Sequence, residues 1–187
     1  MEDKPQQQCV IPLHKPSSKE LAFFFASGIL VSVPFALIFE QLSFLASYAL
    51  TIVVLAPFIE ELAKVFPLFY RHGETERSLV TLGILIGLGF GVSEFALYVT
   101  LAGAPPIVRL PAVAFHASSA GITAYGISKK NPLPYYLISV SLHAVNNFFA
   151  YEASFTFGVF ATLFVFIAAV LLAWNFYQKS SAEKIVV

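Results

Sequence analysis

Six ionisable side chains lie in stretches of the sequence that are otherwise almost wholly apolar. They are Glu60, Glu61, Lys64, Glu94, His116 and His143, and two amides, Asn146 and Asn147, follow the last of them. A carboxylate in a desolvated pocket can act as a general base on water, and an imidazole beside an amide can donate hydrogen bonds to a developing oxyanion. These groups together suffice for amide hydrolysis without a covalent intermediate.

Several other known sets of catalytic residues are missing from the chain. Asp3 is the only aspartate, so chemistry that needs an aspartate pair is excluded. The zinc motif HExxH does not occur, because His143 is followed by Ala-Val-Asn. Ser93 is followed by Glu94 and lacks the glycine of a GxSG turn. Cys9, the single cysteine, lies outside the apolar stretches and can form no intrachain disulfide.

The composition places these groups in a membrane protein. Of the 187 residues, 58% are hydrophobic and 12% are charged, and 11 cations balance 11 anions. This composition is too apolar for the surface of a soluble domain, and the chain is too hydrophobic to be disordered. The zero net charge and the absence of a basic run exclude nucleic-acid binding.

Six stretches are long and apolar enough to span a bilayer, which predicts an all-α polytopic protein with about six helices around a polar cavity. The first 19 residues carry no apolar stretch, so we expect no cleavable signal peptide. We predict a polar segment 1–19, one catalytic transmembrane domain 20–178 and a C-terminal tail 179–187. The expected spans are residues 21–39, 42–70, 78–101, 110–128, 133–151 and 156–177.

The loop charges predict the orientation of these spans. With the N-terminus inside, nine cations fall in cytoplasmic segments, whereas only Arg109 falls in an outer loop and Lys64 falls within a span. This bias predicts that both termini are cytoplasmic in a multi-pass protein of the cell membrane. The nine are Lys4, Lys15, Lys19, Arg71, Arg77, Lys129, Lys130, Lys179 and Lys184.

Helix geometry brings the polar groups to a similar depth. At the α-helical rise per residue, Glu60, His116 and His143 lie roughly 15–18 Å from the cytoplasmic ends of their spans, and Glu94 and Asn147 roughly 21–24 Å. Four helices thus deliver polar groups to the middle of the membrane, where each alone would be costly. Convergence on one polar cavity is the economical explanation.

Spacing along each helix predicts which polar groups share a face. Glu60 and Lys64 are four residues apart and can pair, whereas Glu61 points about 100° away from Glu60. His143 and Asn147 also share a face. We expect the series Gly83, Gly87, Gly89 and Gly91 to serve close helix packing.

The polar groups form motifs that resemble those of the PrsW-type intramembrane proteases. Residues 56–64, APFIEELAK, are similar to the EExxK motif of that family, and Phe90 to Glu94 resemble its FxxxE motif. His116 ahead of small residues, and the pair His143 and Asn147, resemble the third motif and the fourth, HxxxN. The four occur in order on successive predicted spans.

The resemblance implies a glutamate-dependent intramembrane endopeptidase related to the type II CAAX-processing and bacteriocin-processing proteases. It implies that Glu60 activates water with Glu61 beside it, that His143 and Asn147 stabilise the oxyanion, and that His116 assists. Glu94 and Lys64 stand where the CAAX branch has His and Arg, which favours the PrsW branch. The implied substrate is a membrane-associated protein or peptide, and no cofactor is required.

Three alternatives remain open on the sequence. Glu60, Glu94, His116 and His143 form a donor set that could bind a zinc ion and a water. Intramembrane Glu, His and Lys also mark proton-coupled transporters, although no inverted repeat is evident. A membrane scaffold would need the whole polar set to be structural. Neither the substrate nor the oligomeric state follows from the sequence.

Overall fold

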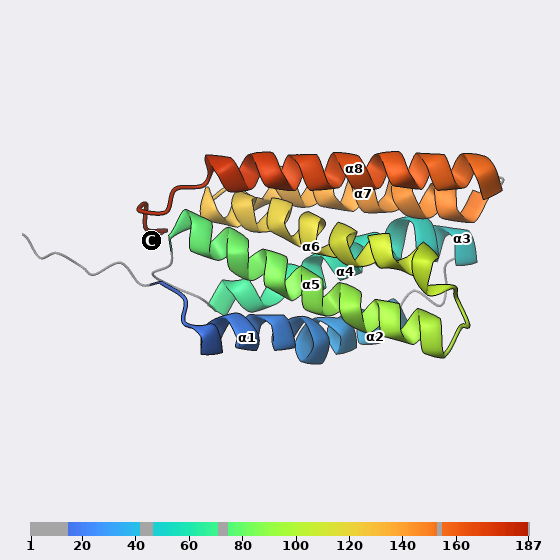
Figure 1. Cartoon of the computed structure of the whole chain (residues 1–187), viewed down its shortest axis with the longest axis horizontal. Helices are drawn as coiled ribbons and strands as arrows, with labels where there is room; N and C mark the ends of the chain where they lie inside the picture. Colours follow the sequence, from blue (N-terminus) through green and yellow to red (C-terminus); the bar gives the residue numbers. More distant parts are fainter. Residues whose placement is uncertain (1–14, 42–46, 71–74, 153–154, 187) are drawn as a thin grey trace, which may run out of the picture.

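The computed structural model describes residues 15–41, 47–70, 75–152 and 155–186, which form six continuous helical segments. The helices run side by side along the long axis of the molecule (Figure 1). The segments agree with the six predicted stretches, although Lys4, Arg71 and residues 42–46 lie outside the described residues. Their elements are α1 Ser18–Ser27, η1 Gly28–Ser32, α2 Val33–Gln41, α3 Tyr48–Leu50, η3 Thr51–Leu55, α4 Ala56–Val65, η4 Phe66–Tyr70, α5 Glu76–Thr100, α6 Pro106–Ser128, α7 Pro132–Glu152 and α8 Phe155–Lys179.

Two of the six segments contain a π-helical turn just ahead of a proline. The turn η1 ends two residues before Pro34, and η3 ends two residues before Pro57. Proline has no N–H, and its ring clashes with the carbonyl one turn earlier, so a wider turn accommodates it. One extra residue in a turn shifts every following side chain by about 100° around the axis. In η3 this shift sets the direction in which Glu60 and Glu61 point.

Helix α5 packs tightly on both sides because of its glycines. A Cβ on Gly87 would lie 2.3 Å from the His116 carbonyl oxygen on α6. A Cβ on Gly89 would lie 2.1 Å from the Phe25 carbonyl oxygen on α1. The glycines therefore serve close packing, as the sequence predicts, and Gly87 in particular holds α6 near α5 at the level of His116.

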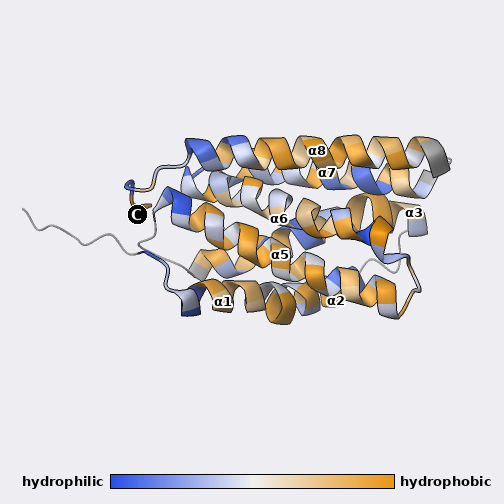
Figure 2. Cartoon of the chain, in the orientation of Figure 1, coloured by the Kyte–Doolittle hydropathy of each residue, from blue (hydrophilic) through white to orange (hydrophobic). Residues whose placement is uncertain are grey.

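The outward-facing surface of the bundle is apolar. Large hydrophobic side chains such as Leu30 and Phe164 are more than 70% exposed, and hydrophobic residues dominate along α8 and along α1 and α2 (Figure 2). Within the described residues, three helical segments are long and apolar enough to cross a membrane, namely Ser18–Gln41, Glu76–Thr100 and Phe157–Lys179. The chain is therefore a helical membrane protein. Crossing by the other three segments stays a prediction.

The C-terminal segment folds back onto the start of α5. The backbone N–H of Glu76 donates to the Lys184 carbonyl oxygen at 3.0 Å, and that of Arg77 donates to Ser181 at 2.9 Å. The Glu76 carboxylate accepts from Lys129 Nζ at 2.5 Å and from the Ser181 N–H at 2.9 Å. The predicted tail is thus bound to the helical domain through at least residue 185, where Ile185 bridges to Thr75.

Candidate active site

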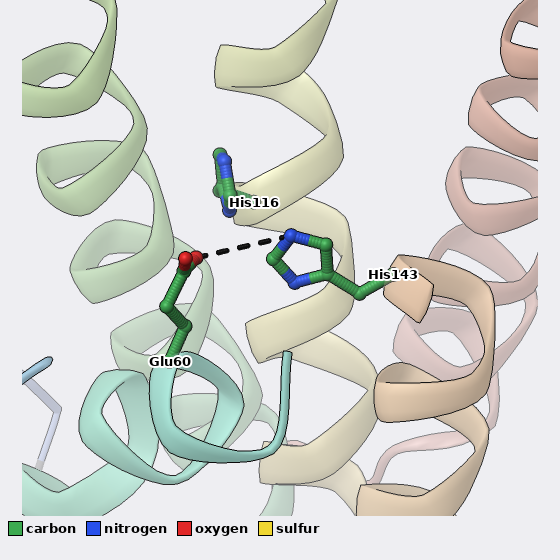
Figure 3. Close-up of side chains that lie close together, drawn as sticks. All are labelled: Glu60, His116 and His143. Atoms are coloured by element: carbon green, nitrogen blue, oxygen red, sulfur yellow. Dashed lines mark ion pairs between the residues drawn. The ribbon is translucent and has the colours of Figure 1, made fainter. Parts of the chain in front are cut away.

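The predicted polar residues on four helices converge in the interior of the bundle. Glu60 on α4, His116 on α6 and His143 on α7 each offer one potential ligand atom, and these three atoms lie within 4.8 Å of one another. Figure 3 shows the Glu60 carboxylate pointing toward the space between the two imidazoles. Both histidines are buried, and Glu60 is partly accessible, with 14% of its side chain exposed.

Glu61 lies behind Glu60 and is completely buried. Its Oε1 accepts from Lys64 Nζ at 2.6 Å and from the Ser119 hydroxyl at 3.2 Å, and it lies 2.8 Å from His143 Nδ1. The spacing predicts a pair between Lys64 and Glu60, and Lys64 Nζ lies 4.0 Å from Glu60 Oε2. Lys64 Nζ lies closer to Glu61 Oε1, at 2.6 Å. Residues three apart on a helix can also meet, which allows this second pair.

The contact between His143 and Glu61 fixes the imidazole. With Nδ1 held by the carboxylate, the other nitrogen, Nε2, faces Glu60 Oε2 at 3.8 Å. A carboxylate on Nδ1 orients the ring and fixes its tautomer. His143 therefore presents Nε2 to the same space as Glu60. Among the described residues, Glu60 Oε2 has no hydrogen-bond partner.

His116 has a comparable arrangement on the other side of the site. Its Nε2 contacts Glu94 Oε2 on α5, and its Nδ1 has no hydrogen-bond partner in the part of the chain that the structure describes. The imidazoles of His116 and His143 meet edge to face, with centroids 5.3 Å apart. Glu94 thus contacts a histidine and lies outside the cluster formed by Glu60, His116 and His143.

Asn147 lies near the site, one turn beyond His143. Its Nδ2 donates to the Ile52 carbonyl oxygen in η3 at 3.1 Å, and its Oδ1 accepts from Asn146 at 3.4 Å. The amide therefore bonds to a carbonyl in the wide turn that precedes Glu60. The oxyanion role that the resemblance implies for Asn147 stays a prediction.

Three further residues lie near the site, and the sequence did not predict them there. Arg109 is predicted in an outer loop, but it lies in the first turns of α6 and donates to Glu94 Oε1 at 2.8 Å. Its position seven residues before His116, about two turns away, was the available signal. Ser119 follows His116 by three residues and so lies close to the same face. Glu40 in α2 is close enough to act electrostatically on Glu60 and Glu94.

The cluster of Glu60, His116 and His143 fits the donor set of a catalytic zinc site. Two imidazoles and one carboxylate from the protein, with a further position open, are typical of zinc hydrolases. Each histidine of such sites usually has its other nitrogen bound to a carboxylate, as Glu61 and Glu94 bind here. The orphaned His116 Nδ1 and Glu60 Oε2 also agree with this assignment.

A helical membrane protein with carboxylates and imidazoles gathered inside its bundle has the attributes of an intramembrane hydrolase. The sequence model of a family described as PrsW family intramembrane metalloprotease matches residues 16–174. The chain therefore belongs to this family of intramembrane proteases, which confirms the resemblance noted from its motifs. Searches of curated proteins and of solved structures found no match.

Proposed function

We propose that the protein hydrolyses a peptide bond of a membrane-spanning or membrane-associated protein, with water activated at Glu60. The observation that carries this proposal is the convergence of Glu60, His116 and His143, whose potential ligand atoms lie within 4.8 Å of one another. Glu60 is the most accessible of the three, with 14% of its side chain exposed, which supports it as the group that water entering the site reaches.

Glu60 and Glu61 have different roles in this proposal. Glu61 already binds Lys64, His143 and Ser119 through Oε1, and it is fully buried. It orients His143 and has no access to substrate. Glu60 and Glu61 each have one oxygen without a hydrogen-bond partner among the described residues, but only the Glu60 side chain is partly exposed, so Glu60 is the one that can take the proton from water. The sequence alone leaves these two glutamates undistinguished.

The histidines act on the substrate side of the site. His143 Nε2 faces Glu60, and we assign it to the scissile carbonyl or to the leaving amine, where a positioned imidazole stabilises charge or moves a proton. His116 occupies the opposite side, held by Glu94. We assign Asn147 to the support of this geometry, because its amide ties α7 to the turn ahead of Glu60.

The test is the cleavage rate of a purified Glu60→Gln variant on a panel of single-span substrates. Loss of a general base lowers the rate by about 10²–10⁴-fold. Glu76→Gln is a matched control, because it replaces another buried glutamate by its amide at the far end of α5. A Glu60→Gln protein that cleaves as fast as wild type would remove Glu60 from this role.

A second candidate is a zinc-dependent form of the same hydrolysis, favoured by the fit of the donor set. Glu60, His116 and His143 would hold the ion, which would supply Lewis acidity that polarises the carbonyl and lowers the pKa of water. Glu61 and Glu94 would orient the two imidazoles, and Lys64 would offset the buried negative charge.

Zinc content separates the two candidates. The zinc-dependent form predicts one zinc per active protein, with loss of metal and activity on chelation and recovery of both on zinc addition. His143→Ala should then lose zinc in parallel with activity. Full activity in metal-free protein favours the glutamate base alone.

We further propose that the helical domain lies in the cell membrane with both termini in the cytoplasm. The starts of α1 and α5 and the ends of α6 and α8 lie on the same side of the bundle as the C-terminus (Figure 1). Hydrophilic residues gather on this side (Figure 2). The cations at or next to these helix ends are Lys19, Arg77, Lys129 and Lys179. Cations concentrate on the cytoplasmic side of membrane proteins. Labelling of Lys130→Cys and Gly103→Cys in intact cells tests this, since only the second should react with an impermeant reagent.

A further inference from the structure

Arg109 enters the polar interior from the first turns of α6, at the end of the bundle opposite to the C-terminus. Its guanidinium donates to Glu94 Oε1 at 2.8 Å and lies over the Tyr98 ring, 3.8 Å from the centroid. About a quarter of its side chain is exposed. Arginine binds carboxylates and stacks on aromatic rings at once, so Tyr98 fixes the plane in which the guanidinium meets Glu94.

The contacts of Arg109 complete a pattern that occurs twice in the site. On one side, Lys64 binds Glu61, which binds His143. On the other side, Arg109 binds Glu94, which binds His116. Each histidine is therefore oriented by a carboxylate, and each carboxylate is held by its own cation.

The two oxygens of Glu94 are divided between these partners. Oε1 meets Arg109, and Oε2 meets His116 Nε2. Since the carboxylate is planar, fixing Oε1 also fixes the direction in which Oε2 points. Loss of the guanidinium would free the carboxylate to rotate, and the imidazole that depends on it would lose its orientation.

We propose that Arg109 is a positioning residue for the reaction, which acts through Glu94 to orient His116 toward Glu60 and His143. This inference rests on the proposed function, in which His116 belongs to the reacting groups. Arg109 does not contact the cluster itself, so its effect should fall on the chemical step and not on substrate binding.

The test compares Arg109→Gln, Glu94→Gln and the double variant in steady-state cleavage of one single-span substrate. Arg109→Gln should lower kcat by about 10–100-fold, the usual effect of removing an outer-shell partner, with KM within twofold of wild type. If Arg109 acts through Glu94, the double variant should be no slower than Glu94→Gln. Arg109→Lys should recover part of the loss, because it retains the charge.

Arg77→Gln is the matched control. Arg77 lies at the other end of α5, far from the cluster. Its guanidinium is also near an aromatic ring, that of Tyr177, and donates to the Ser180 carbonyl oxygen. It should retain wild-type kcat. An Arg109→Gln variant with unchanged kcat, with raised KM alone, or with losses that multiply with those of Glu94→Gln would overturn the positioning role.

A spectroscopic measurement tests the role without relying on cleavage. In protein labelled with 15N-histidine, the shifts of the two His116 nitrogens report the tautomer and the bond at Nε2. We expect these shifts to change in Arg109→Gln and to persist in Arg77→Gln. The two claims can fail separately. If the His116 shifts change in Arg109→Gln but the wild-type protein cleaves no substrate, the proposed function is rejected and the positioning of His116 by Arg109 is supported. Unchanged His116 shifts in Arg109→Gln reject the positioning role whatever the activity.

Discussion

Glu61 and Glu76 are both almost completely buried, and both bind lysine, yet their surroundings differ. Glu61 takes its lysine, serine and histidine partners on one oxygen, Oε1. Glu76 has a cation on each oxygen, with Lys129 Nζ 2.5 Å from Oε2 and Lys184 Nζ 3.2 Å from Oε1. The first lies in the bundle interior, and the second lies at the start of α5.

The difference distinguishes a carboxylate within the proposed active site from one that holds distant parts of the chain together. The partners of Glu76 are Lys129, just after the end of α6, and residues of the C-terminal segment, so its charge joins parts of the chain that are distant in sequence. The partners of Glu61 include an imidazole whose other nitrogen faces Glu60. Its charge therefore directs a reactive group, and neighbouring polar atoms are left available.

The largest effect should come from Glu61→Gln, which leaves Lys64 buried without its closest anion. Breaking a buried ion pair by removing one partner costs about 3–5 kcal/mol. The variant should unfold at a markedly lower temperature in detergent and should lose cleavage.

A double variant, Glu61→Leu with Lys64→Met, separates the loss of thermal stability from the loss of cleavage. Replacing a buried pair by apolar side chains is often neutral or stabilising, so thermal stability should return. Cleavage should not return, because nothing then orients His143. Wild-type cleavage by this variant would contradict the orienting role of Glu61.

Glu76→Gln should have an intermediate effect that is confined to stability. Loss of hydrogen bonds to a charged group costs about 1.5–3 kcal/mol, and the C-terminal segment should become accessible to protease. The kcat should remain that of wild type, since no contact of Glu76 reaches the cluster. A fall in kcat at a temperature where the variant is folded would show that the two regions are coupled.

Lys184→Ala should have the smallest effect. The Lys184 side chain is 68% exposed, so its ion pair with Glu76 is screened by solvent. Exposed pairs contribute about 0–1 kcal/mol, and Lys129 remains to hold the carboxylate. The unfolding temperature should fall slightly, and less at high salt. A loss as large as that of Glu76→Gln would mean that Lys184 is the main partner of Glu76.

The sequence predicted the components of the site better than their contacts. Six helical segments, the polar residues on four of them and the membership of the family all follow from composition, spacing and motif order, because helical periodicity and hydrophobicity are local properties. The spacing pairs Lys64 with Glu60, whereas the closer partner of Lys64 Nζ is Glu61 Oε1, because residues three apart on a helix can also meet. Arg109 was assigned to a loop, because its helix begins earlier than the apolar stretch suggests.

The sequence by itself determined that this is a helical membrane protein with carboxylates and imidazoles at a common depth. Only the tertiary structure decided that His143 meets Glu61, that His116 meets Glu94, and that Glu60 faces both. The physical reason is that such contacts depend on the rotation of each helix about its axis. That rotation is set by the π-helical turn before Glu60 and by the close approach of α5 and α6 at Gly87.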